Sequence, residues 1–306
     1  GIPSLAAYLY PITPTRAFPG MVAANLPTWL ANLGWVNWWS CHLYNLGFFR
    51  MMLPVVNQLR QEILGLAPVP WSYYTRIDQS EVPIIYGYSQ HVLPKPADWG
   101  EQLHLTGYWF LEDGAYQPSD ALAQFLETGP KPVYIGFGSM LDLEAAKTTQ
   151  IVLEALEITG QRAILLGGWS ELGAQALPEN VRRVTDIPHS WLFPRMAAVV
   201  HHGGAGTTAA GLRAGVSPVI VPYFGDQPFW AKHVYQSGAS PAPIPRLKLD
   251  AKKLATALRE ATQEGRIQRT ASQLGNHIRA ESGVADAVNL ISSYLQNPEQ
   301  LMRFNP

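Results

Sequence analysis

The sequence is poor in cysteine, in net charge and in long hydrophobic runs. Its 306 residues contain one cysteine, Cys41, which excludes an intrachain disulfide and a thiolate metal cluster. The formal net charge of −1 argues against a nucleic-acid partner, because such proteins usually present a basic face. No apolar run approaches the ~18 residues that span a bilayer, and the N-terminus has no signal-peptide pattern. These absences predict a soluble, cytoplasmic protein without a transmembrane segment.

From residue 131 to residue 290, short apolar runs alternate with helical patterns. Strands are expected at Val133–Phe137, Arg162–Leu166, Val181–Val184, Ala197–His201 and Ser217–Val221. Helices are expected at Leu143–Ile158, Ser190–Arg195, Thr207–Ala214, Gln227–Gln236, Ala251–Glu264 and Ile267–Glu281. Strands that alternate with helices need crossover connections, and continuously apolar strands are buried on both faces. The pattern therefore predicts a complete Rossmann-like domain, a parallel sheet covered by helices on both faces.

Residues 1–115 follow a different pattern, and residues 116–130 are expected to be a linker. Strands are predicted at Ser4–Leu9, Pro83–Tyr86 and Leu103–Thr106. These are too few for a complete doubly wound domain, and no Gly-rich first turn precedes them. We therefore expect an incomplete N-terminal α/β domain whose first half is missing. Residues 291–306 are expected to be the end of a C-terminal helix and a loose tail.

The segment Pro27–Leu66 is crowded with aromatic side chains and has several interpretations. It is either a helix that packs on the first domain or part of a surface that binds a hydrophobic acceptor. A weak peripheral membrane contact is a third interpretation, although Arg50 and Arg60 are few charges for a basic amphipathic anchor. Exposed strand edges and aromatics would also favour self-association or docking of a complementing fragment.

The pattern most suggestive of chemistry is the strand-to-helix junction at His201-His202-Gly203-Gly204-Ala205-Gly206-Thr207. Such a junction directs unpaired backbone N–H groups and the positive end of the helix dipole at one point. Glycine lets a phosphate approach the backbone, and Thr207 can cap the helix and donate its hydroxyl. Gly-rich junctions are also common as merely tight turns, and the paired histidines favour the phosphate site.

Two further turns should lie at the same edge of the sheet. Asp226 and Gln227 follow the next strand, where a carboxylate and an amide can bridge neighbouring sugar hydroxyls, although Asp226 alone would suit a helix N-cap. The turn Gly136-Phe137-Gly138-Ser139 ends the first strand of the domain. Ligands of parallel sheets bind beyond the carboxyl ends of the strands.

These motifs, with Asp186–Pro194, resemble those of the two-domain GT-B glycosyltransferases. The likeness is greatest to the sterol 3-beta-glucosyltransferase group and to natural-product glycosyltransferases of the vancomycin type. It extends to Pro11–Pro19, Tyr88–Val92 and Thr106–Trp109, and so covers nearly the whole chain. The resemblance implies a hexosyltransferase that uses UDP-glucose, or a dTDP-sugar, and a hydroxyl of a hydrophobic acceptor such as a sterol.

The resemblance also implies roles for individual residues. His201, Gly203, Ala205, Gly206 and Thr207 match positions at the donor diphosphate, together with Gly138 and Ser139. Asp226 and Gln227 match the pair that binds the donor sugar, and Ile187 matches a position whose backbone touches the base. Trp169 is expected either to stack on the base or to pack in the protein.

The expected reaction is an inverting transfer that needs no metal and no cofactor. The catalytic residue is unknown, because no histidine here matches the N-terminal histidine base of the group. His42, His91 and His104 are expected to be polar surface or packing residues. An alternative is a truncated or split, catalytically deficient nucleotide-sugar-binding module that needs another fragment. A Rossmann oxidoreductase is disfavoured, because the turn after the first strand of the 131–290 domain lacks Gly-x-Gly-x-x-Gly.

Overall fold

The computed structural model describes residues 2–24, 26–72, 82–111, 114–138, 144–167, 172, 176–297 and 302–304. The chain divides into two compact units. The first unit consists of Gly1–Trp109 and Ser282–Pro306, and the second of Phe110–Glu281. The chain passes from one unit to the other after Trp109 and again after Glu281. These positions differ from the domain boundaries at residues 115, 130 and 290 that were expected from the sequence.

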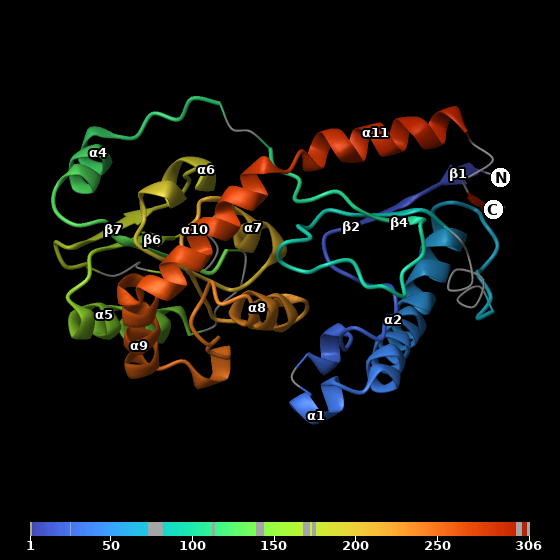
Figure 1. Ribbon diagram of the computed structural model, residues 1–306, viewed down its shortest axis with the longest axis horizontal. Helices are drawn as coiled ribbons and strands as arrows, with labels where there is room; N and C mark the ends of the chain where they lie inside the picture. Colours follow the sequence, from blue (N-terminus) through green and yellow to red (C-terminus); the bar gives the residue numbers. More distant parts are fainter. Residues whose placement is uncertain are drawn as a thin grey trace. The chain divides into compact units, whose positions relative to one another are not determined.

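The second unit is built on a five-stranded sheet (Figure 1). The order of its strands is β7-β6-β5-β8-β9, and every neighbouring pair is parallel. The strands are β5 (Val133–Gly136), β6 (Ala163–Leu166), β7 (Val181–Val184), β8 (Val199–His201) and β9 (Pro218–Ile220). The predicted parallel sheet is confirmed, with strands one or two residues shorter than expected where they differ.

Helices cover both faces of this sheet, as predicted, because successive strand residues face opposite sides. Ile135 contributes to a buried cluster with α5 and α9, and Tyr134 to a second one with α4 and α6. Figure 1 shows α5 and α9 on one side of the sheet and α4 and α6 on the other. The helices are α4 (Asp120–Glu127), α5 (Ala145–Thr159), α6 (His189–Leu192), α7 (Ala205–Arg213), α8 (Gln227–Gln236), α9 (Ala251–Gln263) and α10 (Gly265–Ala280), with short 3₁₀ turns at Phe193–Arg195 and Arg246–Lys248.

The stretch 116–130, expected to be a linker, contains helix α4. The Ser119 hydroxyl accepts a hydrogen bond from the backbone N–H of Leu122 and caps the helix. Leu122 and Phe125 are buried in the core of the second unit. The helix is therefore part of that unit, because its apolar residues, three positions apart, share one face.

The first unit contains a small parallel sheet of β2 (Ala6–Tyr8), β3 (Ile84–Tyr86) and β4 (Leu103–Leu105). The expected strand Ser4–Leu9 is divided, because β1 (Ile2–Ser4) pairs instead with β10 (Met302–Phe304) in an antiparallel ribbon. Part of the expected loose tail is therefore a strand. Helical elements of this unit are η1 (Met21–Ala23), α1 (Thr28–Ala31), α2 (Gly34–Glu62) and α11 (Gly283–Gln296).

Specific contacts hold the Pro11–Pro19 loop and α11 within the first unit. The Thr13 and Tyr86 hydroxyls are 2.6 Å apart, and the Thr15 hydroxyl donates to the Asp98 carboxylate at 2.6 Å. On α11, the Tyr294 hydroxyl lies 2.8 Å from Nε2 of His104. The C-terminal helix therefore belongs to the first unit, although its sequence follows directly on the second.

Glycine allows α10 and α7 to approach closely in the second unit. A Cβ at Gly275 would lie 2.7 Å from Cα of Gly215 and 2.8 Å from the carbonyl oxygen of Leu212. These are backbone atoms, which cannot rotate away. We expect Gly275→Ala to lower the free energy of unfolding by about 1–3 kcal/mol, the usual cost of overpacking. Urea titration measures the change.

Gly211→Ala on α7 is the matched control, since no atom lies within 4 Å of its added Cβ. It should be neutral or stabilise the protein by up to about 1 kcal/mol, because alanine favours helix more than glycine does. Equal destabilisation by both variants would show that close helix approach is not the cause.

Candidate functional site

The carboxyl ends of three neighbouring strands form one row. Gly136 of β5 is paired with His201 of β8, which is paired in turn with Ile220 of β9. The chain leaves β5 toward β6 and later returns to β8 on its other side, so the crossovers diverge between β5 and β8. Such a divergence opens a crevice beyond the strand ends, where parallel sheets bind ligands.

Helix α7 begins beside this row of strand ends and presents unpaired amides. Its first residue is Ala205, preceded by Gly204 in an extended conformation (φ −61°, ψ 145°). The first amide that donates to a helical carbonyl is that of Thr208, to Gly204, at 3.0 Å. The amides of Ala205, Gly206 and Thr207 therefore have no i−4 partner in the helix. Gly206 is exposed, and a Cβ added there would meet no atom within 4 Å, so the helix start is open.

Thr207 does not cap α7. The helix starts two residues earlier than predicted, and no side chain forms a cap hydrogen bond at Gly204. The cause is the backbone of Gly203, whose φ of +91° turns the chain directly after the strand. Thr207 is therefore the third residue of the helix, where its hydroxyl is not needed as a cap.

His201 is a neutral hydrogen-bond donor at the end of β8. The side chain is fully buried, and its Nδ1 accepts the backbone N–H of Gly203 at 3.0 Å. The ring proton must therefore be on Nε2, which has no hydrogen-bond partner among the described residues. Burial, with smaller effects of His202 and His189, lowers the pKa of His201 to about 3. An unpaired buried donor costs free energy and favours an acceptor supplied by a ligand.

His202, which the sequence did not assign to the site, lies between two turns. A Cβ at Gly138 would come within 2.9 Å of its Cε1, and a Cβ at Gly204 within 2.5 Å of its Nε2. Both glycines are thus required for the imidazole to fit between the turns after β5 and β8. The signal in the sequence was the pair of adjacent histidines, but their neighbours could not be known without the fold.

Gly203 allows the turn after β9 to pack against the turn after β8. A Cβ on Gly203 would be 2.7 Å from Cγ2 of Ile220 and 3.3 Å from the carbonyl oxygen of Gln227. The structure therefore joins the turns after β5, β8 and β9 through glycine contacts. This close packing places Asp226 and Gln227 beside the start of α7.

Asp226 and Gln227 have different environments. Asp226 directly precedes α8, but its side chain forms no cap hydrogen bond. The interpretation of Asp226 as a helix N-cap is therefore not supported. Its pKa is raised by burial, which outweighs hydrogen bonds from its own backbone and from Trp230. The Oε1 atom of Gln227 accepts the backbone N–H groups of Tyr223, at 2.8 Å, and Phe224, at 3.3 Å. The Gln227 oxygen thus holds the turn closed.

The other predicted donor residues lie further along the edge or outside the described residues. Ile187 follows β7, and its side chain is buried in the core of the second unit. Three strand spacings separate β7 from β8, roughly 14 Å at the usual distance between strands. Ser139 and Trp169 lie outside the described residues.

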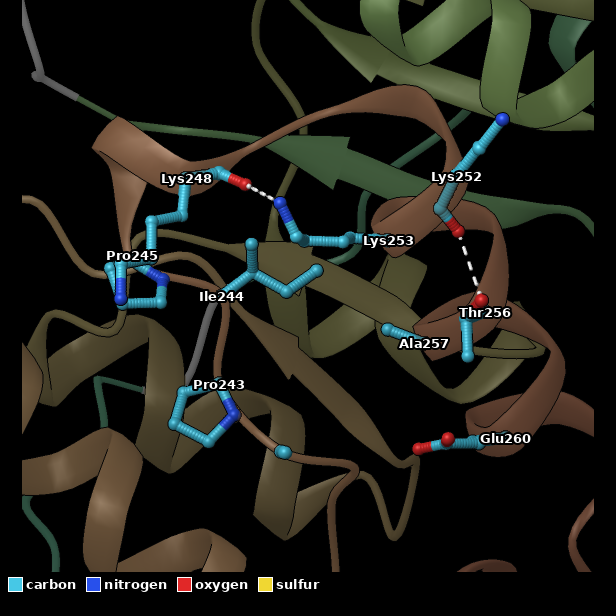
Figure 2. A pocket seen from close by; sticks show the side chains of 10 residues that line it. Pro243, Ile244, Pro245, Lys248, Lys252, Lys253, Thr256, Ala257 and Glu260 are labelled. Atoms are coloured by element: carbon cyan, nitrogen blue, oxygen red, sulfur yellow. Dashed lines mark hydrogen bonds between the residues drawn. The ribbon is translucent and has the colours of Figure 1, made fainter.

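A separate hollow of about 440 Å³ lies between residues 242–248 and α9 (Figure 2). Two of its three lysines, Lys252 and Lys253, do not present their ammonium groups to an anion there. The Lys253 ammonium donates to the carbonyl oxygen of Lys248 at 2.9 Å and pairs with Asp250 at 2.5 Å. In Figure 2 the Lys252 side chain points away from the hollow. The row of strand ends at His201 is therefore the better candidate.

Residues 154–292 match the family described as "Erythromycin biosynthesis protein CIII-like, C-terminal domain". The chain is 41% identical over 305 residues to a sterol 3-beta-glucosyltransferase of Arabidopsis thaliana, covering 96% of this chain and 47% of the relative. It is 38% identical to a sterol 3-beta-glucosyltransferase of Yarrowia lipolytica, covering 99% of this chain and 21% of the relative. The chain thus spans less than half the length of these relatives.

Solved structures with the same fold include the glycosyltransferase of kitacinnamycin, with a TM-score of 0.58 and 21% identity over 84% of this chain and 68% of that one. The calicheamicin glycosyltransferase CalG4 has a TM-score of 0.57 and 19% identity, over 79% of this chain and 58% of that one. The resemblance to sterol and natural-product glycosyltransferases and the GT-B type fold predicted from the sequence are both confirmed.

Buried neutral histidines make stability depend on pH. Burial lowers the pKa of His201 to about 3 and that of His233 to about 4, from an ordinary 6.5. Below pH 6.5 the unfolded chain therefore binds protons that the folded chain does not. We expect the free energy of unfolding to fall between pH 6.5 and about 4, by roughly 1.4 kcal/mol per pH unit for each histidine.

Urea unfolding at pH 7 and pH 5 measures this loss. His233→Gln should remove part of it, whereas His277→Gln, at an exposed position on α10, should leave it unchanged. A difference between the two pH values that is the same for all three proteins would contradict the assignment.

Proposed function

We propose that this chain binds a UDP-sugar and serves an inverting, metal-independent transfer of the sugar, glucose, to a hydroxyl of a hydrophobic acceptor. The observation that carries the proposal is the open start of α7 beside the buried Nε2–H of His201. The start of α7 offers three amides and the positive end of a helix dipole, and His201, four residues before that start, offers one imidazole N–H. Together they suit the diphosphate of a nucleotide sugar.

The neutral state of His201 defines its role in this proposal. With Nδ1 occupied by the amide of Gly203, the ring donates a hydrogen bond through Nε2 but supplies no proton to the leaving group. It stabilises the charge that grows on the diphosphate as the sugar departs. A fixed donor in a buried site does this without reorganisation of solvent.

We propose that the sugar is held by the turn after β9. The Asp226 carboxylate is not used for capping and accepts hydrogen bonds from neighbouring sugar hydroxyls. Gln227 contributes its amide N–H groups, because its oxygen holds the turn. In this proposal the backbone near Ile187 contacts the base and Gly138 contacts the diphosphate, and Ser139 remains a predicted contact of the diphosphate. Trp169 remains a predicted contact of the base.

In the proposed reaction the acceptor oxygen attacks the anomeric carbon from the face opposite the diphosphate. The new C–O bond forms as the bond between the anomeric carbon and the phosphate oxygen breaks, UDP leaves, and configuration inverts. The hydroxyl proton passes to a general base, which typically contributes about 10²–10⁴-fold. We assign that base to no residue of this chain.

Sequence similarity supports the choice of substrates. The relatives named above are sterol 3-beta-glucosyltransferases with 38% to 41% identity over nearly all of this chain. A sterol or similar lipid alcohol is therefore the proposed acceptor class, and UDP-glucose the proposed donor. A dTDP-sugar is the alternative donor, and the two are distinguished by comparing their affinities.

Thermal unfolding with UDP-glucose tests donor binding. At a concentration near 100 Kd, the ligand should stabilise the protein by about 2.7 kcal/mol and raise Tm by several degrees. His201→Asn keeps an acceptor for the Gly203 amide and removes the Nε2 donor. It should weaken binding roughly 10–100-fold, the usual worth of a hydrogen bond to a charged group. His201→Gln, whose amide nitrogen can reach the Nε2 position, should retain more affinity.

Gly206→Asp provides a test in which stability and binding change in opposite directions. A carboxylate in the first turn of α7 favours the helix by about 0.3–1 kcal/mol but repels a diphosphate. The variant should therefore unfold no more easily than the wild type and bind UDP-glucose poorly, while Gly206→Ala binds it well. Unchanged affinity in Gly206→Asp would place the diphosphate elsewhere.

A second candidate function is a nucleotide-sugar-binding module that needs another polypeptide for turnover. The reason to consider it is that no residue of this chain is assigned the role of general base. Assays of UDP-glucose hydrolysis and of transfer to cholesterol distinguish the two functions. Binding without turnover, restored by a fragment from a longer relative, would support the module; turnover by the chain alone would exclude it.

A further inference from the structure

His202 is a second buried histidine, directly after β8, and the proposed transfer gives it no role. Its surface is 9% exposed, and burial lowers the pKa of its ring, which is therefore neutral at about pH 7. The rings of His201 and His202 are 6.4 Å apart and almost perpendicular, at 88°. The two imidazoles thus have separate surroundings, and each needs its own explanation.

The imidazole of His202 lies between the turn after β5 and the start of α7. A Cβ on Gly138 would be 2.9 Å from its Cε1 and 3.4 Å from its Nδ1. On the other side of the ring, a Cβ on Gly204 would be 2.5 Å from Nε2. Gly204 is the N-cap residue of α7, directly before Ala205, whose amide has no helical acceptor. The Nε2 atom of His202 therefore lies against the residue at which the helix starts.

The surroundings of Nδ1 assign the proton of the neutral His202 ring to Nε2. The Nδ1 atom is buried and has no hydrogen-bond partner in the described part of the chain. A neutral imidazole has one N–H donor and one acceptor nitrogen. A buried donor without an acceptor is rarer in proteins than a buried acceptor that is not fully used. The less costly tautomer therefore has its lone pair on Nδ1 and its N–H at the start of α7.

Packing alone does not explain an imidazole at this position. An apolar side chain would fill the space between Gly138 and Gly204 and would leave no buried nitrogen without a partner, which costs free energy. The unpaired amides and the dipole of α7 favour an anion next to the same N-cap residue. An N–H of His202 at that residue is useful once an anion is bound, because it then has an acceptor.

We propose that His202 is a second imidazole donor to the diphosphate, which it contacts through Nε2 at the start of α7. This inference rests on the proposed function, because it needs a diphosphate at that place. A diphosphate has more acceptor oxygens than one imidazole can satisfy, and a hydrogen bond from a neutral donor is strengthened by the charge of the acceptor. The inference also gives Gly138 and Gly204 a role, since they leave the space that the ring occupies.

Calorimetric titration of the full chain with UDP tests the contact. His202→Asn removes the donor at the Nε2 position and should weaken UDP binding roughly 10–100-fold, the usual worth of a hydrogen bond to a charged group. His202→Gln, whose amide nitrogen can reach that position, should retain more affinity. The matched control is His233→Asn on α8, which removes another neutral imidazole of the second unit and should leave UDP affinity unchanged.

Gly204→Ala displaces the imidazole of His202 without removing it. Gly204 has φ −61° and ψ 145°, which alanine adopts without strain, but the methyl group would be 2.5 Å from Nε2. The ring must shift, and UDP affinity should fall roughly tenfold. Gly206→Ala is the control, because no atom lies within 4 Å of its Cβ, and it should bind UDP as the wild type does. Equal affinities of the two alanine variants would contradict the contact.

The double variant separates a direct contact from a general disturbance of the helix start. In His202→Asn the donor is already absent, so adding Gly204→Ala should cost little more, because two changes that act through one group are not additive. Losses that multiply in full would show that the methyl group acts independently of the imidazole, and would overturn the inference.

Nitrogen NMR spectra of isotope-labelled histidine observe the His202 ring in the wild type. We expect a protonated Nε2 and an unprotonated Nδ1 in the free chain, and a shift of the Nε2 signal when UDP saturates the protein. A proton on Nδ1 of the free chain, an Nε2 signal that UDP does not move, or wild-type affinity in His202→Asn would each overturn this inference while UDP binding stands. A wild-type chain that binds neither UDP nor UDP-glucose would overturn the proposed function as well.

Discussion

The architecture of the site depends on the parallel register that aligns Gly136, His201 and Ile220. Because β5, β8 and β9 end in one row, the turns that follow them start from the same edge and must pack against each other. Side chains would keep these turns apart. Gly138, Gly203 and Gly204 remove that obstacle, and in each case a Cβ would overlap a neighbouring group of the site. This edge of the sheet is thus packed by backbone and by two imidazole rings.

Burial gives His201 a narrow chemical role. A solvent-exposed imidazole near an anion would become a cation, but this ring is buried and its Nδ1 is already engaged by the Gly203 amide. It therefore offers one neutral N–H, through Nε2. A site built from neutral donors and a helix dipole binds an anion without a buried positive charge, which would be costly when the site is empty.

The two units use apolar residues in different ways. In the second unit they are buried on both faces of the sheet by α4, α5, α6 and α9. In the first unit a core of aromatic side chains, with Tyr86 and Trp99 stacked at 4.9 Å, is accompanied by a helix whose large apolar side chains face outward.

The sequence alone determined the alternation of strands and helices in residues 131–290, the parallel sheet and the family resemblance. The boundaries of α8 were predicted to the residue, because periodic apolar positions and flanking polar residues are local signals. Three features were decided by tertiary structure. Helix α4 is too short to be distinguished from a linker before its Leu122 and Phe125 meet the core. The start of α7 depends on the positive φ of Gly203, and the tautomer of His201 depends on the amide that this turn directs at Nδ1. Each of these depends on contacts or backbone angles that become defined only when the chain folds, and local patterns do not encode them.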